Sequence, residues 1–158
     1  MDNFEAVMEE MVPNIRIRVA GILIKDNEIL LVRHEKNQKN YWLLPGGGIE
    51  FGETAEAALA REFQEEVGLK IKIGKLVLVH DSVPTDLHRQ VLNLYFLVTA
   101  EKFEIQVTTD EVLKDAQFYP FAEFSKMTVN PDVKAEITEG ISNNWVESSR
   151  YLGNRWRD

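Results

Sequence analysis

The first part of the chain shows the alternation of apolar and polar residues that is typical of β-strands. Over Ile15–Ile24 the first apolar residues, Ile15, Ile17 and Val19, alternate with Arg16 and Arg18. A polar turn at Lys25–Glu28 precedes a second apolar run at Ile29–Val32, so the pattern predicts a β-hairpin. The polar stretch His34–Asn40 is expected to be a loop, and Tyr41–Leu44 is expected to be a short apolar segment after it.

After a run of glycines, the apolar residues recur at the spacing of an α-helix. Thr54 is a suitable N-cap and Gly68 is a suitable terminating residue, so a helix is predicted between them. The apolar residues of this stretch recur at helical spacing: Ala55, Ala58, Leu59 and Phe63. The predicted helix therefore has one apolar face that packs on the rest of the protein, and one charged face.

The part of the chain after this helix alternates between strand-like and loop-like segments. Strands are predicted at Leu69–Val79, with a bend or a break at its glycine, and at Gln90–Val98, with a loop at Asp81–Leu87 between them. A short strand is predicted at Ile105–Val107 within a polar stretch, and a last strand at Ala116–Pro120.

Two helices and a tail are predicted towards the C-terminal end. Phe121–Met127 is expected to be a short helix, and Asn130 followed by Pro131 is typical of a helix start, so a helix is expected through about Ile141. Residues 145–158 are expected to form an aromatic-rich tail. Strands and helices are mixed without regular strand–helix–strand alternation. The pattern therefore argues against a doubly wound parallel sheet.

Length and composition agree with a single domain over residues 1–158, with 1–14 as an acidic lead-in. The sequence has no cysteine, which excludes a disulfide framework, a cysteine-ligated zinc ion and a thiol nucleophile. No apolar run approaches the roughly 20 residues of a membrane helix, and no signal-peptide pattern opens the chain. We therefore expect a cytoplasmic protein without a membrane contact. The net charge of −8 argues against a nucleic-acid partner, and it means that bound cations must mediate an encounter with any phosphate compound.

The charged face of the predicted helix concentrates carboxylates. Glu62, Glu65 and Glu66 fall within one helical turn, where like charges repel unless water or a cation separates them. Oxygen ligands of this kind suit Mg²⁺ or Mn²⁺, and Arg61 is placed to hold one carboxylate by a bidentate ion pair. A solvated acidic helix face is the competing interpretation of these residues taken alone.

The glycines before the helix also indicate a ligand site. Gly46, Gly47 and Gly48 let the backbone approach a ligand closely, and a carbonyl oxygen there can add to a metal site. The stretch Gly47–Thr54 is similar to a phosphate-binding loop of the form G-x-x-x-x-G-K-[ST], but Glu53 stands where the lysine belongs. A carboxylate at that position repels phosphate, so a loop of the ATPase type is excluded.

Residues 47–69 as a whole resemble the signature of the Nudix hydrolase family, G-x5-E-x7-R-E-U-x-E-E-x-G-U, where U is apolar. Every defined position of that signature is matched, from Gly47 to Leu69. The preceding segment Trp42–Gly47 and the hairpin before it are similar to the family as well. The resemblance implies an α/β/α sandwich, with a mixed sheet and a loop–helix–loop catalytic motif.

The resemblance also implies an activity and a set of site residues. Nudix enzymes hydrolyse the diphosphate bond of a nucleoside diphosphate linked to a moiety X, and they use Mg²⁺ or Mn²⁺. The implied metal ligands are the carbonyl of Gly47 and the carboxylates of Glu62, Glu65 and Glu66. Glu53 would support the site or bind the metal through water, and Arg61 would orient a glutamate. The general base stays open between Glu62 and an acid outside the signature, for which Glu111 is the best candidate.

The identity of X depends on residues outside the signature. The candidate substrate contacts are Arg18, Arg33, His34, Trp42, Gly46, Pro84, His88 and Arg89. Pro84 lies 15 residues beyond Leu69, and a proline near that place resembles a mark of ADP-ribose and related nucleotide-sugar hydrolases in the family. A nucleoside diphosphate sugar such as ADP-ribose is therefore the first expectation. Nucleoside triphosphates, damaged ones included, and dinucleoside polyphosphates are the alternatives.

Other kinds of function are weaker interpretations of the same residues. A catalytically silent binding module of this fold usually lacks a carboxylate of the signature, and none is missing here. RNA end processing needs a basic track, against which the net charge counts. A homodimer is compatible with the aromatic-rich tail at 145–158, which suits an interface.

Overall fold

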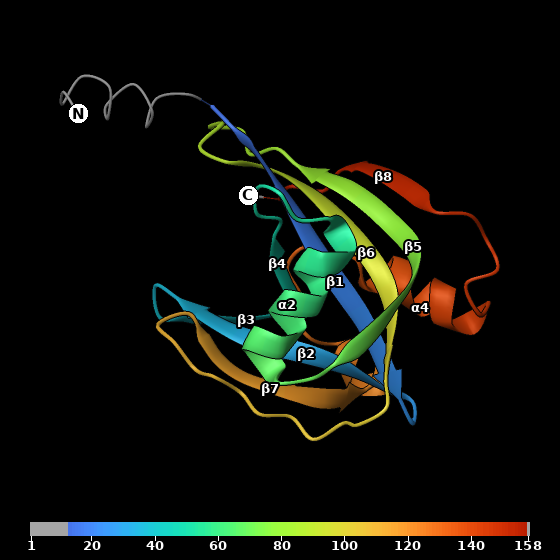
Figure 1. Cartoon of the computed structure of the whole chain (residues 1–158). Coiled ribbons are helices and arrows are strands. Elements are labelled where there is room, and N and C mark those ends of the chain that lie inside the picture. The colour runs from blue at the N-terminus through green and yellow to red at the C-terminus, as the bar shows by residue number, and fades with distance from the viewer. Residues whose placement is uncertain (1–12, 158) are drawn as a thin grey trace.

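Helices cover both faces of a mixed sheet (Figure 1), in a computed structural model that describes residues 13–157. The predicted lead-in lies outside the described residues as far as residue 12. The strands of the described range are β1 (Ile15–Lys25), β2 (Glu28–Lys36), β3 (Lys39–Leu43), β4 (Gly46–Gly48), β5 (Ile71–Ser82), β6 (Gln90–Ala100), β7 (Leu113–Pro120) and β8 (Arg150–Asn154). Its helices are α2 (Ala55–Val67), α3 (Phe121–Phe124) and α4 (Lys134–Ser142).

The sheet has the spatial order β3-β2-β1-β6-β5-β8, with β4 paired to β1 and β7 paired to β2. β1 runs parallel to β6 and β5 runs parallel to β8, whereas β2, β4 and β7 join by antiparallel pairs. The expected mixed sheet is confirmed. The predicted first hairpin is confirmed as well, because Asp26 and Asn27 have φ values of 51° and 64°, which suit a two-residue turn of type I′.

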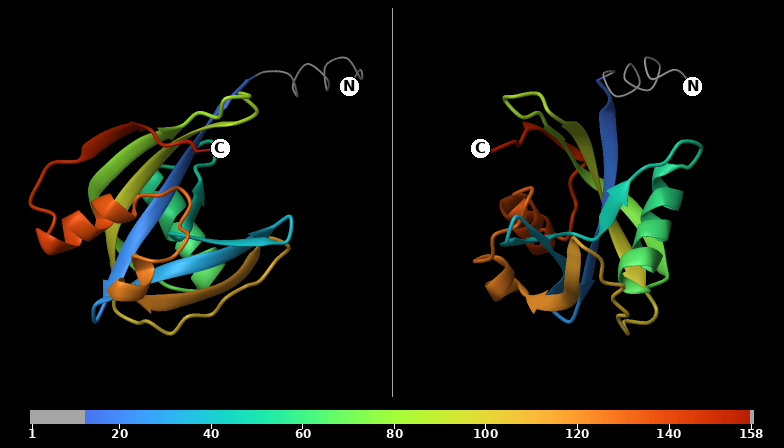
Figure 2. Two further views of the ribbon diagram at one scale, coloured as in Figure 1. Left: turned by 180° about the vertical axis from the view of Figure 1, so that it is seen from behind. Right: turned by 90° about the vertical axis from the view of Figure 1, so that its left-hand side faces the viewer.

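Each face of the sheet has its own hydrophobic core. The right-hand view of Figure 2 shows α2 on one side of the sheet, with α3 and α4 on the other. Along β1 the side chains of Val19 and Leu23 belong to the α2-side core, and those of Ala20 and Ile22 belong to the α4-side core. β1 therefore runs through the middle of three layers, and the expected α/β/α arrangement is confirmed.

α2 begins and ends where its capping residues predict. The Thr54 side chain accepts a hydrogen bond from the Ala57 N–H (3.1 Å), and Gly68 has a left-handed φ of 67°. Phe63 is fully buried on the apolar face of the helix. A Cβ at Gly21 of β1 would lie 2.5 Å from the Phe63 ring, so glycine is required for helix and sheet to approach this closely.

The expectation of a loop at His34–Asn40 is wrong. β2 continues to Lys36 and β3 begins at Lys39. Asn37 and Gln38 form the two-residue turn between the strands, with φ values of 52° and 61°. The stretch is polar because this second hairpin extends beyond the two cores, where its side chains are exposed or half-buried.

Ile105–Val107 does not form the predicted strand. Residues 101–112 are an irregular connection in which Ile105 and Val107 pack on the α2-side core, and the Gln106 N–H donates to the Val67 carbonyl (2.9 Å). The apolar alternation here reflects packing at the C-terminal end of α2 and not a pairing in the sheet. The bent strand predicted after α2 is confirmed as β5, which shows register shifts against β6 and extends further, to Ser82.

α4 starts later than predicted, at Lys134 and not directly after Asn130. The Asn130 N–H donates to the Trp42 carbonyl (2.9 Å), and the Trp42 N–H donates to the Thr128 carbonyl (3.2 Å), so this segment pairs with β3 and does not cap a helix. The expected tail at 145–158 contains a strand, β8, which the local pattern does not indicate because its partner β5 lies far away in the sequence. Among the described residues no helix has the length and apolar character needed to cross a membrane.

Replacing Phe63 by alanine should destabilise the protein by about 3–5 kcal/mol, because the change removes a fully buried ring between α2 and β1 and leaves a cavity. Phe51→Ala is the matched control, since the Phe51 ring is fully exposed on the loop before α2. Urea denaturation followed by circular dichroism measures the free energy of unfolding of both variants. Equal losses would contradict the burial of this helix face.

Candidate metal and substrate site

Two of the three clustered carboxylates of α2 contact the short glycine strand β4. Glu62 is half-buried, and a Cβ at Gly47 would lie 2.3 Å from its carboxylate carbon, so the glycine backbone is in contact with that side chain. Glu66 accepts a hydrogen bond from the Gly46 N–H (3.1 Å), whereas Glu65 is largely exposed. The three glycines therefore form a short strand and not a loop. Their pairing with β1 brings a backbone edge against the acidic face of the helix.

Arg61 holds this group of carboxylates together. Its guanidinium forms a two-point ion pair with Glu53 (2.6 and 3.1 Å) and donates to the Gly48 carbonyl (3.1 Å). Its remaining nitrogen donates to Glu62 (2.9 Å) and, at a longer distance, to Glu65 (3.3 Å). The hydrogen bonds between Arg61 and Glu53 lower the pKa of the carboxyl and raise the pKa of the guanidinium, so both groups stay charged at neutral pH.

Glu66 differs from its neighbours because burial dominates its energetics. Burial raises the pKa of Glu66 to about 8; the charges of Glu62 and Asp110 add to this rise, while Arg18 and the Gly46 N–H oppose it. Within residues 13–157 no group donates to its buried Oε2 atom. A buried, unpaired carboxylate oxygen is costly, and a bound cation would stabilise it.

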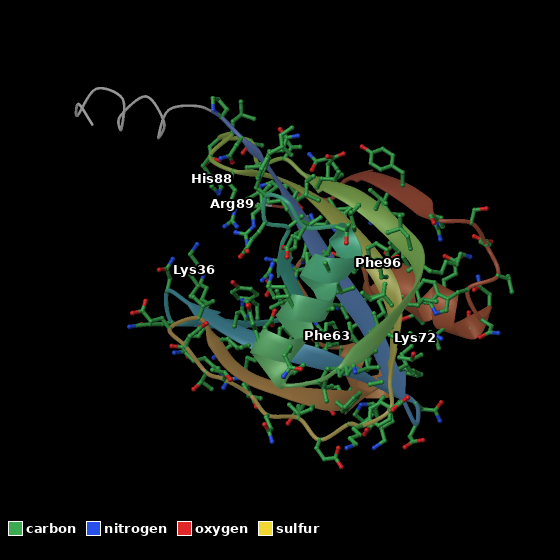
Figure 3. All side chains as sticks on the ribbon, in the orientation of Figure 1. Lys36, Phe63, Lys72, His88, Arg89 and Phe96 are labelled. Carbon is green, nitrogen blue, oxygen red and sulfur yellow. The ribbon has the colours of Figure 1, made fainter. Side chains whose placement is uncertain are left out.

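Arginines from two elements gather at the same end of the molecule. Arg16 and Arg18 share one face of β1, and burial together with the nearby charge of Arg89 lowers the pKa of Arg16. Arg18 is half-buried and donates to the Leu44 carbonyl (2.8 Å). Figure 3 shows Arg89, on the loop between β5 and β6, at the same side as Lys36 on the β2–β3 hairpin. This group of arginines is basic although the net charge of the protein is −8, so the group suits an anionic ligand.

The donor set fits a divalent metal ion in its chemistry. Carboxylates and a backbone carbonyl are the hard ligands that Mg²⁺ and Mn²⁺ prefer, and the Oε2 atom of Glu66 is buried without a hydrogen-bond partner. Over the described range, however, no three acidic, histidine or cysteine side chains are gathered in an arrangement that would hold an ion. In this structure Arg61 pairs with Glu53, Glu62 and Glu65.

The two candidate substrate contacts on β2, His34 and Arg33, have different surroundings in the structure. His34 is half-buried, and its pKa is lowered by burial and by the charge of Arg18. Its ring meets that of Tyr41 edge to face, with 5.7 Å between the ring centroids. Arg33, the preceding residue, instead donates to the Asn40 side chain across the hairpin (2.6 Å). The structure therefore brings His34 together with the basic group, while Arg33 stabilises the hairpin.

Trp42 and Pro84 have structural partners. Trp42 packs against the α4-side core, and its indole N–H donates to the Tyr119 hydroxyl (2.9 Å). Pro84 is buried, and its carbonyl accepts a hydrogen bond from the Leu87 N–H (3.1 Å) in a turn of the β5–β6 loop. His88, on the same loop, is exposed. A role of these residues in substrate binding stays a prediction.

Two residues outside the predicted set lie at the site. The charge of Asp110 acts on Glu66, whereas Glu111, the acid predicted from the sequence, is an exposed residue beside it. Nothing in the local sequence distinguishes these two acids. Arg16 is the other addition, and its alternation with Arg18 along β1 is the signal that would include it.

A cleft of about 800 Å³ lies away from these carboxylates. It is enclosed by the C-terminal end of α2, the start of β5 and residues 99–106, with Lys70, Lys72 and Lys102 in its lining. In Figure 3 the labelled Lys72 lies on the opposite side of α2 from Arg89. None of the three α2 carboxylates lines this cleft, so cleft volume alone does not identify the site.

Fold and site together place the chain in a known family. The family model described as the NUDIX domain matches residues 15–140, and the chain belongs to this family, as its sequence predicted. A solved NUDIX hydrolase from Nitrosomonas europaea has the same fold, with a TM-score of 0.72 at 19% identity over 87% of this chain and 93% of that one. Divalent metal ions are general cofactors of the family.

Two relatives show which named activities resemble this chain. An ADP-ribose pyrophosphatase of Methanocaldococcus jannaschii is 36% identical over 112 residues, which are 70% of this chain and 65% of the relative. An 8-oxo-dGTP diphosphatase of Proteus vulgaris is 34% identical over 90 residues, which are 54% of this chain and 78% of the relative. The chain thus spans less than two thirds of the first relative's length.

Mg²⁺ should stabilise the wild-type protein and should stabilise Glu66→Gln much less. The glutamine keeps an acceptor for the Gly46 N–H but lacks the charge that a cation requires. At an ion concentration about 100 times the dissociation constant, binding adds about 2.7 kcal/mol. That gain raises the Tm of a protein of this size by roughly 5–10 °C. Thermal denaturation in Mg²⁺ and in EDTA measures the shift.

Glu136→Gln is the matched control for this variant, because Glu136 also has a buried and unpaired Oε2 atom but lies on α4, paired with Arg155. The control should keep the full Mg²⁺ shift. A full shift in Glu66→Gln would exclude Glu66 as a ligand.

Proposed function

We propose that this protein is a Mg²⁺-dependent pyrophosphohydrolase that cleaves the diphosphate bond of a nucleoside diphosphate linked to a second moiety. One observation carries the proposal: a single turn of α2 carries Glu62, Glu65 and Glu66, with the Glu62 carboxylate against the Gly47 backbone and the Oε2 atom of Glu66 buried without a partner. Membership of the NUDIX family supports it. A silent binding module fits less well, because every carboxylate of the family signature is present.

The metal ligands in this proposal are the Gly47 carbonyl and the carboxylates of Glu62, Glu65 and Glu66, with Mn²⁺ as a substitute for Mg²⁺. The bound ion would supply charge neutralisation at the phosphoryl oxygens and a lowered pKa for the attacking water. Arg61 gives up its contact with Glu65, which is longer at 3.3 Å than its contact with Glu62 at 2.9 Å. Its two-point pair with Glu53 keeps the guanidinium in place.

The arginines at the same end bind the anionic part of the substrate. Arg16, Arg18 and Arg89 would neutralise phosphate oxygens and orient the diphosphate for in-line attack by water on one phosphorus. The bridging oxygen then leaves with the other phosphoryl product. A carboxylate takes the proton from the water; Glu62 and an acid of residues 101–112 are the candidates, and in that segment the charge of Asp110 acts on Glu66.

A nucleoside diphosphate sugar such as ADP-ribose is the substrate that we put first. The name of the Methanocaldococcus jannaschii relative supports it, as does Pro84 at its place after the signature. The name of the Proteus vulgaris relative supports a damaged nucleoside triphosphate instead. The arginines favour neither class, because both present phosphate oxygens to them.

Glu65→Gln should lower turnover by at least about 100-fold, because it removes a charge that acts on the metal and the transition state. The fold should be retained, since Glu65 is largely exposed and a surface ion pair contributes about 1 kcal/mol or less. Glu56→Gln, an exposed position in the first turn of the same helix, is the control. Steady-state hydrolysis in Mg²⁺ measures both, and an unchanged rate in Glu65→Gln would refute its assignment as a ligand.

A hydrolysis screen in Mg²⁺ across ADP-ribose, nucleotide sugars, dinucleoside polyphosphates and nucleoside triphosphates tests the substrate class. We expect the highest kcat/KM for a nucleoside diphosphate sugar. Faster hydrolysis of any triphosphate would overturn this choice while leaving the reaction class intact. Hydrolysis of none of these compounds, with binding retained, would favour the silent module.

A further inference from the structure

Arg89, on the exposed β5–β6 loop, lies near the arginines of β1. Its charge acts on Arg16, whose pKa is also lowered by Arg18, so positive groups from β1 and from the β5–β6 loop repel one another. Residues 85–89 of this loop are exposed, and Leu87 has a left-handed φ of 56°. An exposed loop that carries a cation towards other cations needs contacts that hold it there.

Asn154, the last residue of β8, supplies such contacts. Its side-chain Oδ1 accepts a hydrogen bond from the Val83 N–H (3.0 Å), and its Nδ2 donates to the Val83 carbonyl (3.2 Å). A carboxamide has the same donor and acceptor as a peptide group, so this pair continues the β5–β8 ladder into the first residue of the loop. We call it the Asn154–Val83 pair.

Neighbouring contacts fix β8 and the residues after it around the same loop. The Arg155 N–H donates to the Asp81 carbonyl (2.8 Å), and the Arg155 side chain pairs with the largely buried Glu136 of α4. The Trp156 ring lies edge to face against His88, with 5.7 Å between the ring centroids. The segment is therefore anchored on one side to α4 and touches the β5–β6 loop on the other.

We propose that Asn154 is a positioning residue for substrate binding: it fixes Val83 so that the β5–β6 loop presents Arg89 to the anionic part of the substrate. The inference rests on the proposed function for the identity of that substrate. It requires only an anion site at Arg89, so binding of inorganic pyrophosphate can test it independently of nucleotide hydrolysis. Asn154 acts through Arg89 and does not touch the ligand.

A double-mutant cycle tests this inference. Isothermal titration with Mg²⁺ and inorganic pyrophosphate is performed on the wild type, Arg89→Ala, Asn154→Ala and the double variant. Arg89→Ala should weaken binding by about tenfold or more, because a charge-assisted contact to phosphate is lost. Asn154→Ala should weaken binding about fivefold in the wild type but not in the Arg89→Ala background, because two groups that act through one contact are not additive.

Ser149→Ala is the matched control. It removes a side-chain hydrogen bond from the segment before β8 to the Leu76 carbonyl of β5, away from the loop, so it should leave pyrophosphate affinity unchanged. Asn154→Asp keeps the acceptor for the Val83 N–H and loses the donor, so its affinity should lie between those of the wild type and Asn154→Ala. With a hydrolysed substrate, Asn154→Ala should raise KM more than it lowers kcat.

Three outcomes would overturn the inference: wild-type affinity in Asn154→Ala, an Asn154→Ala loss that persists without Arg89, or an equal loss in Ser149→Ala. Absence of pyrophosphate binding by the wild type would overturn it too, because no anion site would then depend on the loop. Binding that follows the predicted cycle in a protein that hydrolyses nothing would uphold the positioning role and refute the proposed function instead.

Discussion

The close approach of α2 to the sheet at two glycines is the constraint on which the site depends. A Cβ at Gly21 would lie 2.5 Å from the Phe63 ring, and a Cβ at Gly47 would lie 2.3 Å from the Glu62 carboxylate. Phe63 and Glu62 are neighbours on the helix, so the contact that buries the ring also presses the carboxylate against β4. A larger residue at either glycine would separate the acidic face from its backbone partner.

The charged residues at this end of the molecule form two groups, one of carboxylates on α2 and one of arginines on β1 and the β5–β6 loop. On α2, Arg61 neutralises some of the carboxylates and leaves Glu66 buried with an unpaired oxygen. On β1 and the β5–β6 loop, arginines repel one another. A metal ion would stabilise the first group and a diphosphate would stabilise the second, so the proposed substrate, a diphosphate with a bound ion, would meet both requirements at once. This complementarity is the physical reason for preferring a metal-dependent reaction on phosphate anhydrides.

The sequence predicts the parts of the site that depend on neighbours along the chain. The helix caps, the turn with Glu62, Glu65 and Glu66, and the first hairpin all follow from residue spacing. Features that depend on partners far away in the sequence are not predicted by residue spacing. β8 forms by pairing with β5, and residues 128–130 are held by hydrogen bonds with Trp42. The charge of Asp110 acts on Glu66 only because the folded chain brings residues 101–112 near that carboxylate, which is what distinguishes Asp110 from Glu111. Local pattern therefore identifies the chemistry better than it identifies the residues that surround it.

Parallel pairing joins distant parts of this chain, since Ile15 lies beside Gln90 and Leu78 lies beside Arg150. Each pairing closes a long loop before its first hydrogen bond forms, whereas the hairpins close locally and therefore sooner. The β5–β8 ladder is short, so it gains least from that closure and is expected to join last. The acidic turn of α2 is local, whereas the proposed positioning of Arg89 by Asn154 requires that β8 has already paired. A partly folded chain would therefore attract cations before it could hold a diphosphate.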